Sequence, residues 1–216
     1  MENNKVEEKE PKERILNAAA SLFASKGYAA VGVREIADLA QVNVSMISYY
    51  FNGKFGILKE IILRYFQEVR QIYDQILAKN LPPEDALRNV VHELVNLMKN
   101  KAIFCKVAIT EMPFNLPEFS DFKANVIRLH IDYIKQGLKL IELFVDDPKY
   151  GSIITPAMIS LVFSHFLFGP LIKKVWSIEL NNEYYELYAK TISTLMLEGI
   201  IGIKKLIEQN NQGEEK

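Results

Sequence analysis

The sequence contains a single cysteine, Cys105, among its 216 residues. No disulfide can therefore form within the chain, and so little cysteine is typical of proteins from a reducing compartment. The first eleven residues, MENNKVEEKEP, are charged and contain no apolar stretch, so they do not have the pattern of a signal peptide. We therefore expect a cytoplasmic protein.

Glycine and proline are also sparse, with 10 and 8 residues respectively. Few segments alternate apolar and polar residues, which is the pattern that a sheet with one solvated face requires. Hydrophobic residues at 49% and charged residues at 25% are ordinary for a soluble globular protein. The composition therefore favours an all-α protein, and the apolar periodicity predicts about nine helices.

The sequence also lacks the spacings that mark metal and catalytic sites. Its three histidines, His92, His130 and His165, do not occur in Glu-x-x-His or His-Glu-x-x-His motifs. We find no nucleophile–base pair and no phosphate-binding loop. We therefore expect no metal, no cofactor and no catalytic residues, and we interpret Cys105 as a buried apolar side chain. His165 lies in the most apolar segment and is expected to be a hydrogen-bonded core or interface residue.

Charge is nearly balanced, with a formal net charge of −1. Residues 12–71 carry eight Lys or Arg against five Asp or Glu, whereas residues 72–216 carry sixteen against eighteen. The asymmetry is weak. A small basic footprint at the N-terminal end is nevertheless enough for modest binding to phosphates.

The most informative stretch is residues 33–54, VREIADLAQVNVSMISYYFNGK. Residues 34–40 place apolar side chains on one face of a helical period. Asn43 can cap the free amides of a following helix, which we expect over residues 44–50. The outward row of that helix is uncharged and consists of small, hydroxyl-bearing and aromatic residues: Val44, Ser45, Ser48 and Tyr49. Such a face suits the major groove of B-DNA, so the stretch predicts a helix-turn-helix motif.

This motif and the preceding RILNAAASLFASKGY resemble the TetR family of bacterial transcriptional regulators over about 45 contiguous positions. The positions that fit the family pattern are Arg34, Ile36, Ala37, Ala40, Val42, Ile47, Tyr49, Phe51 and Lys54. Four features depart from it. Gln41 replaces the turn glycine, so the turn forms without glycine or with a non-glycine residue at positive φ. Ser48 stands for the common tyrosine, Tyr50 for the common histidine, and Phe55-Gly56 for two acidic residues.

The resemblance implies that residues 44–50 enter the major groove while Arg34, Tyr49 and Lys54 hold the DNA backbone. Lys54 opens a helix, and a helix N-terminus with an adjacent lysine attracts a phosphate oxygen. Serine hydroxyls can reach base edges, and Val44 can contact a thymine methyl group. The predicted DNA-binding residues are Arg34, Asn43, Val44, Ser45, Ser48, Tyr49, Tyr50 and Lys54.

The chain divides, on this interpretation, into four segments. Residues 1–10 form a disordered arm, and residues 11–71 a DNA-binding domain with its motif at about 32–51. Residues 72–207 form a ligand-binding and dimerisation domain, and residues 208–216 a flexible tail. The expected helices span residues 11–25, 34–40, 44–50, 54–79, 83–99, 102–111, 118–145, 156–176 and 182–207, with Thr155 capping the eighth.

Residues 153–172 contain no Asp, Glu, Lys or Arg and are long enough to span a bilayer. Pro156, Gly169-Pro170 and His165 interrupt the segment, and its flanks carry mixed charge rather than a one-sided basic cluster. We therefore favour a helix buried on all sides over a transmembrane helix. A chain of this length rarely encloses a helix completely, so we expect a second copy to provide part of its covering.

The predicted C-terminal domain is rich in aromatic residues, which can enclose an apolar pocket. The family resemblance implies a small-molecule effector, and the candidate contacts are Phe104, Met112, Phe122, Tyr133, Phe163, Phe166 and Trp176. Small residues beside apolar ones in the last two helices predict a dimer interface. Its candidate residues are Ser160, Leu161, Ser164, Phe168, Leu195, Gly199, Gly202 and Ile203.

Together these features predict a homodimeric, ligand-responsive regulator that binds a palindromic operator, most simply as a repressor released by a small apolar or aromatic effector. Two alternatives remain. One is an activator or architectural DNA binder of the same family. The other is a helical lipid carrier or enzyme bundle with a vestigial helix-turn-helix, for which no catalytic spacing exists.

Overall fold

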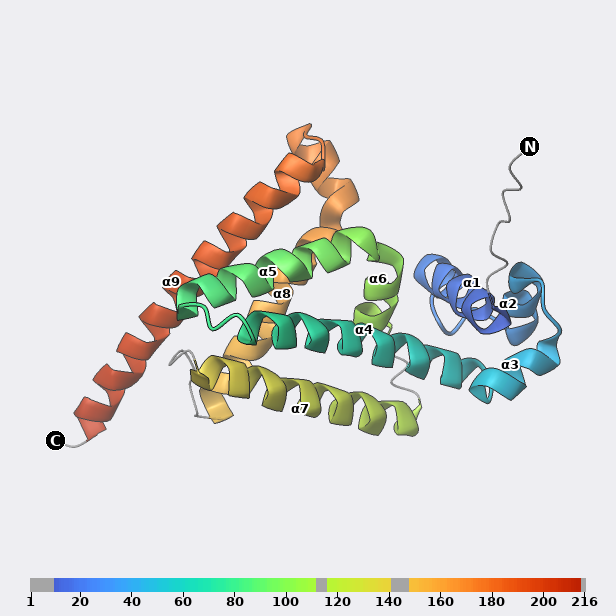
Figure 1. The fold of residues 1–216 in the computed structure, drawn as a ribbon, viewed down its shortest axis with the longest axis horizontal. Helices are drawn as coiled ribbons and strands as arrows, with labels where there is room; N and C mark the ends of the chain where they lie inside the picture. The colour runs from blue at the N-terminus through green and yellow to red at the C-terminus, as the bar shows by residue number, and fades with distance from the viewer. Residues whose placement is uncertain (1–9, 112–115, 141–147, 215–216) are drawn as a thin grey trace. The chain divides into compact units, whose positions relative to one another are not determined.

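The structure is a computed structural model that describes residues 10–111, 116–140 and 148–214. Every regular element in these ranges is a helix, so the predicted all-α class with nine helices is confirmed for the described residues (Figure 1). The helices are α1 (Pro11–Lys26), α2 (Val33–Ala40), α3 (Val44–Phe51), α4 (Lys54–Leu77), α5 (Pro83–Asn100), α6 (Ala102–Thr110), α7 (Pro117–Leu140), α8 (Pro148–Trp176) and α9 (Asn182–Glu214).

The chain forms two compact units. Unit 1 comprises residues 1–66 and 103–123, and unit 2 comprises residues 67–102 and 124–216. Unit 1 thus contains α1 to α3, most of α4, α6 and the start of α7. The first boundary between the units lies after residue 66, and residues 103–123 belong to the N-terminal unit.

The core of unit 1 is built from the apolar faces that the sequence periodicity indicates. Three side chains of α1 are fully buried: Ile15, Leu16 and Phe23. Ile36 of α2 is fully buried as well, and Ile47 of α3 is 1% exposed. Two pairs of residues on successive turns of α4 complete the core: Ile57, Leu58, Ile61 and Ile62. Removing these side chains from water is the main force that holds the short α2 and α3 in place, because helices of eight residues are marginal alone.

Charged contacts tie α4 to α1 within this unit. The guanidinium of Arg64 donates to Glu13 through two nitrogens, at 2.7 and 3.0 Å, and its Nε lies 3.1 Å from Glu60 Oε1. The hydrogen bonds that Arg64 donates to Glu13 raise the pKa of Arg64 further above its ordinary value. A two-nitrogen contact of this kind fixes orientation as well as charge. It therefore sets how α4 lies against α1.

Residues 103–123 join unit 1 through contacts that are distant in sequence. The backbone N–H of Tyr28 donates to Glu111 Oε2 at 2.8 Å, and Lys106 Nζ donates to the carbonyl of Ala24 at 2.8 Å. The rings of Phe55 and Phe119 lie 6.2 Å apart. Sequence periodicity cannot reveal such contacts, because it reports which face of a helix is apolar and not which partner covers it.

Unit 2 is organised around α5, which packs against both α8 and α9. The side chains of Val91 and Val95 on α5 are buried, as are Ile192 and Met196 on α9. In Figure 1, α9 crosses α5, while α8 and α9 meet at the turn between them and then diverge. This arrangement leaves a long flank of α8 and α9 facing away from the rest of unit 2.

Two helix boundaries differ from the expected ones. Helix α8 begins at Pro148 and continues through Pro156, so Thr155 is not its cap. Pro148 offers an equally good first-turn proline, and α8 accommodates Pro156 inside the helix even though that residue has no N–H. Helix α9 continues to Glu214, so most of the predicted flexible tail is helical. Residues 1–9 of the arm predicted at 1–10, and the end of the seventh predicted helix at 141–145, lie outside the described residues.

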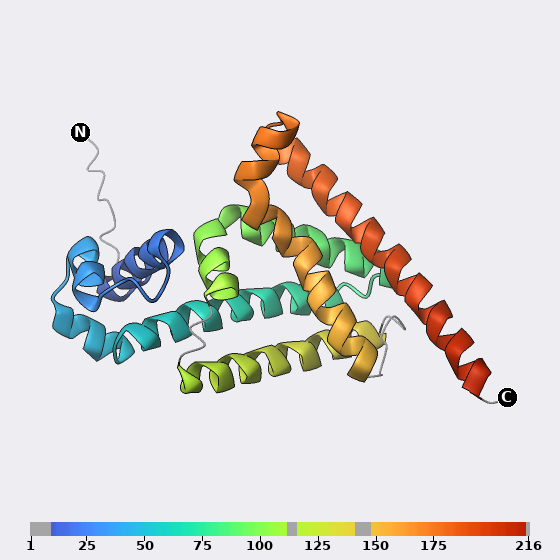
Figure 2. The ribbon, with the colours of Figure 1, turned by 180° about the vertical axis from the view of Figure 1, so that it is seen from behind.

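The apolar helix α8 is not buried on all sides, contrary to expectation. Among the described residues it is the one helix, over Lys149–Trp176, that is long and apolar enough to cross a membrane, by length and composition alone. Only 11% of its most apolar 18-residue window is buried. Figure 2 shows α8 from the other side, where its outer flank faces no other helix of unit 2. This flank therefore needs a cover that the single chain does not supply.

Candidate nucleic-acid interface

The turn between α2 and α3 is made by Gln41 in the left-handed conformation, with φ 53° and ψ 49°. Its N–H donates to the carbonyl of Asp38 at 3.2 Å, and that of Val42 donates to Ala37 at 3.0 Å. A non-glycine residue pays a steric cost at positive φ, because its Cβ crowds the backbone. Of the two options that the sequence leaves open, the structure adopts the turn with positive φ.

Asn43 caps α3, as predicted from its position. Its Oδ1 accepts hydrogen bonds from the backbone N–H of Ser45 at 2.9 Å and from the Ser45 hydroxyl at 2.8 Å. The Ser45 hydroxyl thus has an intramolecular partner, although its oxygen can still accept a hydrogen bond. The cap fixes the first turn of α3, the part of a recognition helix that comes nearest to base edges.

The outward face of α3 is accessible and uncharged. Val44, Ser45 and Ser48 are exposed, and Tyr49 is the most open at 83% of its surface. The rings of Tyr49 and Tyr50 lie 5.0 Å apart in an edge-to-face arrangement. Arg34, on α2, is exposed as well. These side chains share one accessible motif, and their contacts with DNA stay predictions.

Lys54 has a structural role that the sequence did not suggest. Its ammonium group donates to the carbonyls of Tyr28 at 2.9 Å and Val31 at 2.7 Å, and lies 4.3 Å from the centre of the Tyr28 ring. Burial lowers its pKa below the ordinary lysine value. Lys54 therefore holds the segment between α1 and α2 against the start of α4. A phosphate contact stays a prediction, and it would use the third N–H of the ammonium group.

Gly56 is a second residue whose structural role could not be predicted from the sequence. A Cβ at this position would lie 1.5 Å from the carbonyl oxygen of Phe51 and 2.7 Å from its carbonyl carbon. Both atoms are backbone, so no side-chain rotation can relieve the clash. Glycine is therefore required where the first turn of α4 passes the last turn of α3, and this close approach sets the angle at which α3 is presented.

The buried side chain of Lys123 caps the C-terminal end of α6. Lys123 is only 6% exposed, and its Nζ donates to the carbonyls of Ala108, Ile109 and Glu111 at 3.1 to 3.3 Å. Burial is the main reason that its pKa falls to about 8. The carbonyls at a helix C-terminus lack helical partners, and a lysine can satisfy them. Lys123 thus fixes Glu111, whose carboxylate binds Tyr28.

The predicted effector residues do not gather around one cavity in the described structure. Phe104 and Phe122 belong to unit 1, whereas Phe163 and Phe166 belong to unit 2, where Phe166 stacks on Tyr185 at 5.3 Å. Trp176 is 66% exposed. Met112 and the side chain of Tyr133 lie outside the described residues. An effector contact by any of these seven residues stays a prediction.

The predicted dimer residues lie on α8 and α9, and a dimer contact by any of them stays a prediction. Phe168 and Leu195 are large apolar side chains that are half exposed. Ser160, Gly199 and Gly202 are exposed, Leu161 and Ser164 are half-buried, and the side chain of Ile203 lies outside the described residues. His165 of α8 is buried among the rings of Tyr184 and Tyr188, and its Nε2 has no hydrogen-bond partner in the described part of the chain.

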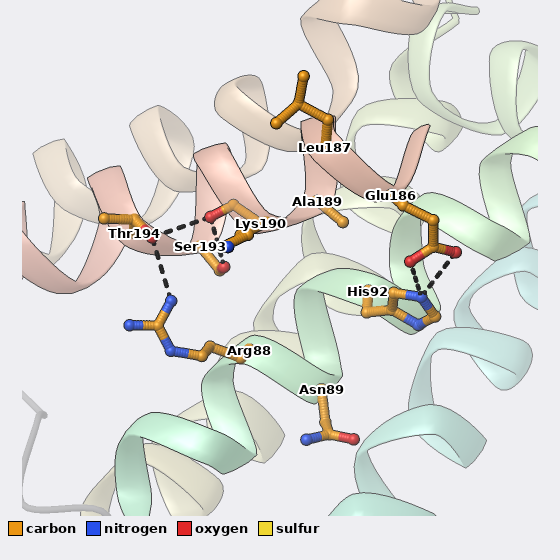
Figure 3. A pocket seen from close by; sticks show the side chains of 9 residues that line it. All are labelled: Arg88, Asn89, His92, Glu186, Leu187, Ala189, Lys190, Ser193 and Thr194. Atoms are coloured by element: carbon orange, nitrogen blue, oxygen red, sulfur yellow. Dashed lines mark hydrogen bonds and ion pairs between the residues drawn. The ribbon is translucent and has the colours of Figure 1, made fainter. Parts of the chain in front are cut away.

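Unit 2 also contains a groove between α5 and α9 that the sequence did not indicate (Figure 3). None of the seven predicted effector residues lines it. Most of its lining residues carry a polar group, and they include Arg88, His92, Glu186, Lys190 and Thr194. The spacing of these residues on two separate helices carries no signal in the sequence, because only the packing of α5 on α9 brings them together.

Comparison with known proteins identifies the N-terminal region. Residues 15–61 match the family described as bacterial regulatory proteins, tetR family. YttP of Bacillus subtilis is 43% identical over 56 residues, which cover 26% of this chain and 27% of that protein. The repressor KstR2 of Rhodococcus jostii is 31% identical over 77 residues, which cover 36% of this chain and 38% of that protein. These matches thus span well under half of the relatives' length.

Solved structures extend the likeness of fold to most of the chain. A TetR-family regulator from Bordetella parapertussis superposes with a TM-score of 0.68 at 18% identity, covering 86% of this chain and 93% of the other. The residues matched by the family include α2, the Gln41 turn and α3, whose helix-turn-helix geometry the structure shows. Residues 15–61 therefore form a helix-turn-helix domain of the tetR family of bacterial regulatory proteins, and the chain shares its fold with TetR-family regulators of known structure.

Proposed function

We propose that the protein is a homodimeric repressor of the bacterial cytoplasm, released from a palindromic operator by a small apolar or aromatic effector. The observation that carries the proposal is the exposed, uncharged face of α3, held by the Asn43 cap and by Gly56 against α4. Such a face can approach base edges without electrostatic conflict. The side chains proposed to contact bases are Val44, Ser45 and Ser48, and those proposed to hold the backbone are Arg34, Tyr49 and Lys54.

Several relatives support repression as the direction of regulation. KstR2 of Rhodococcus jostii, NicS of Pseudomonas putida and KstR of Mycobacterium tuberculosis are each named transcriptional repressors. A repressor needs only to occupy its operator, so tight and releasable DNA binding is sufficient for function. Repression is therefore the simplest use of this DNA-binding unit.

The open flank of α8 and α9 supports a dimer. It exposes Leu167, Phe168 and Leu171 on α8 and Leu195 on α9, all large apolar residues. Several large apolar side chains exposed on two neighbouring helices support an interaction site there. Two helices from each chain would form a four-helix interface with two-fold symmetry. The same symmetry would place two α3 helices about one DNA turn or slightly more apart.

The contact between Glu111 and Tyr28 supports a route for effector control. Glu111 follows α6, and Tyr28 lies in the segment that Lys54 holds against α4. A change in α6 would therefore move the base of α4 and, through Gly56, the orientation of α3. A coupling free energy of about 1–3 kcal/mol is typical of such regulation. To shift the equilibrium towards the DNA-free conformation, the effector must bind that conformation more tightly than the DNA-binding one.

Operator selection tests the proposal directly. Random duplex DNA is enriched on the full-length protein, and the selected sequence is titrated by fluorescence anisotropy at physiological salt. We expect a palindrome bound with a dissociation constant of about 10⁻⁸ M or below, and at least about a thousandfold preference over unrelated DNA. Binding without sequence preference, or no enrichment of a palindrome, would overturn the proposal.

The phosphate contact of Lys54 has its own test. Lys54→Met should weaken binding to all sequences about equally and reduce the slope of log affinity against log salt by about 1. Lys79→Met, which replaces an exposed lysine in the turn that follows α4, is the matched control and should change neither. An unchanged slope with a lower melting temperature would assign Lys54 to the folding of residues 28–31 alone.

A further inference from the structure

The groove between α5 and α9 has a volume of about 810 Å³, within the range of small-molecule sites. It lies entirely in unit 2, and the two helices that form it run in opposite directions (Figure 3). Arg88 and His92 lie one turn apart on α5, opposite Thr194 and Glu186 on α9. Lys190 lies midway between these two residues of α9, one turn from each.

The charges in the groove are not balanced. Glu186 is the one carboxylate among its lining residues, and both of its oxygens bind His92 Nε2, at 2.9 and 3.2 Å. Lys190 lies one turn from Glu186 on α9, at a spacing that allows an ion pair between the two side chains. The described structure shows no ion pair between them. Arg88 also has no carboxylate partner among the described residues. Two cationic side chains therefore line the groove, and neither forms an ion pair with a described carboxylate.

The position of Arg88 is fixed by a neutral partner. Its Nη1 donates to Thr194 Oγ1 at 3.1 Å, and Thr194 Oγ1 in turn donates to the carbonyl of Lys190 at 2.9 Å. The rest of the guanidinium keeps its N–H groups for another acceptor, and a guanidinium matches the two oxygens of a carboxylate or phosphate. The Asn89 side chain lines the groove next to Arg88, and its amide nitrogen donates to the carbonyl of Asp85 at 2.8 Å.

We propose that this groove binds a small anionic molecule through a carboxylate or phosphate group held by Arg88 and Lys190. Thr194 orients Arg88, and Glu186, the one carboxylate that lines the groove, hydrogen-bonds with His92 and pairs with neither cation in the described structure. Loss of either cation removes one of the two charges that hold the anion. The proposal is independent of the DNA-binding function, because every residue involved belongs to unit 2 and the ligand differs in chemistry from the proposed apolar effector.

The test uses the full-length protein and two probes, benzoate and inorganic phosphate, each followed by amide chemical shifts in a ¹H–¹⁵N NMR titration at constant ionic strength. We expect saturable shifts for residues of α5 and α9 with at least one probe. Saturation with benzoate alone identifies a carboxylate site, and saturation with phosphate alone identifies a phosphate site. Shifts that grow linearly and spread over the surface with both probes would overturn the proposal.

Three variants make the assignment specific. Arg88→Met and Lys190→Met should each weaken binding by about tenfold or more, which corresponds to about 1.4 kcal/mol. Lys174→Met, which removes an exposed charge from α8, is the control and should leave the affinity unchanged. Far-UV circular dichroism melts establish that each variant is folded. Wild-type affinity in both folded groove variants would also overturn the proposal.

Discussion

At the scale of single residues, Gly56 controls how α3, the proposed recognition helix, is presented. Its position is set by the backbone of Phe51, and a Cβ would lie 1.5 Å from that carbonyl oxygen. From the sequence alone, Phe51 could be assigned to the core and Lys54 to the DNA contact, because both fit a known pattern. Gly56 fits no pattern, and its requirement follows from the close approach of two backbones, which no local periodicity records.

Gly56→Ala should lower the free energy of unfolding by roughly 3 kcal/mol, because the end of α3 or the start of α4 must move to admit the methyl group. Urea denaturation measures the change. Gly151→Ala is the matched control, since its Cβ would meet nothing within 4 Å inside helix α8. The control should be neutral or stabilising by up to about 1 kcal/mol. Equal midpoints for wild type and Gly56→Ala would contradict the steric argument.

His165 illustrates a buried polar atom without compensation. Its side chain is 6% exposed, and its ring centre lies 4.4 Å from that of Tyr188 and 5.2 Å from that of Tyr184. The sequence correctly indicated burial, but the expected hydrogen bond is missing at Nε2 in the described part of the chain. Desolvation lowers the pKa of His165 below the ordinary value of 6.5. The folded state therefore disfavours the protonated ring.

His165→Phe should raise the free energy of unfolding by about 1 kcal/mol near neutral pH, because it removes an unsatisfied buried nitrogen. The gain should grow as the pH falls below 6.5. In that range the unfolded wild type takes up a proton that the folded state resists, so wild-type stability falls while the variant is unaffected. Urea denaturation at pH 7.5 and pH 5.5 tests both statements. A smaller gain at the lower pH would show that protonated His165 is accommodated.

At the scale of helices, the periodicity of α1 to α4 was sufficient to predict their buried faces, because each face covers a local core. The start of α8 was not predictable in this way. Pro148 and Pro156 offer two alternative first turns, and the choice depends on the packing of the whole helix. The association of α6 with unit 1 was equally hidden, since it depends on single long-range bonds such as that from Tyr28 N–H to Glu111.

Glu111→Leu should lower the stability of unit 1 by about 1–2 kcal/mol, because the Tyr28 N–H loses its charged acceptor. It should also weaken operator binding, since residues 28–31 support the base of α4. Glu111→Gln keeps an acceptor oxygen and should recover most of both losses. Thermal melts and anisotropy titrations measure the two effects. Glu118→Leu, on the exposed first turn of α7, is the control and should leave operator affinity unchanged.

At the scale of the whole molecule, the single chain leaves its most apolar helix largely uncovered. The sequence indicated that a second copy would be needed, although it suggested much deeper burial than the 11% observed. Composition reports how apolar a helix is, but the area that neighbouring helices can cover depends on their arrangement. In this protein α8 and α9 diverge from their common turn and leave that area open (Figure 1).

Leu195→Asp should convert the proposed dimer to monomer at micromolar concentration, because it would place two unpaired carboxylates in an apolar interface. Sedimentation velocity measures the change, and operator affinity should fall with it. Leu129→Asp, which introduces the same charge at an exposed position of α7, is the control and should remain dimeric. A dimeric Leu195→Asp protein would place the interface elsewhere on the molecule.

The absence of charge on the outer face of α3 has a consequence for a cell whose internal ion concentration changes. Dissolved ions compete with the protein for phosphates, and they compete much less with neutral side chains for base edges. A rise in intracellular salt would therefore reduce occupancy at all operators in similar proportion. The ranking of strong and weak operators would stay the same, so osmotic stress would relax the whole set of controlled genes without reordering it.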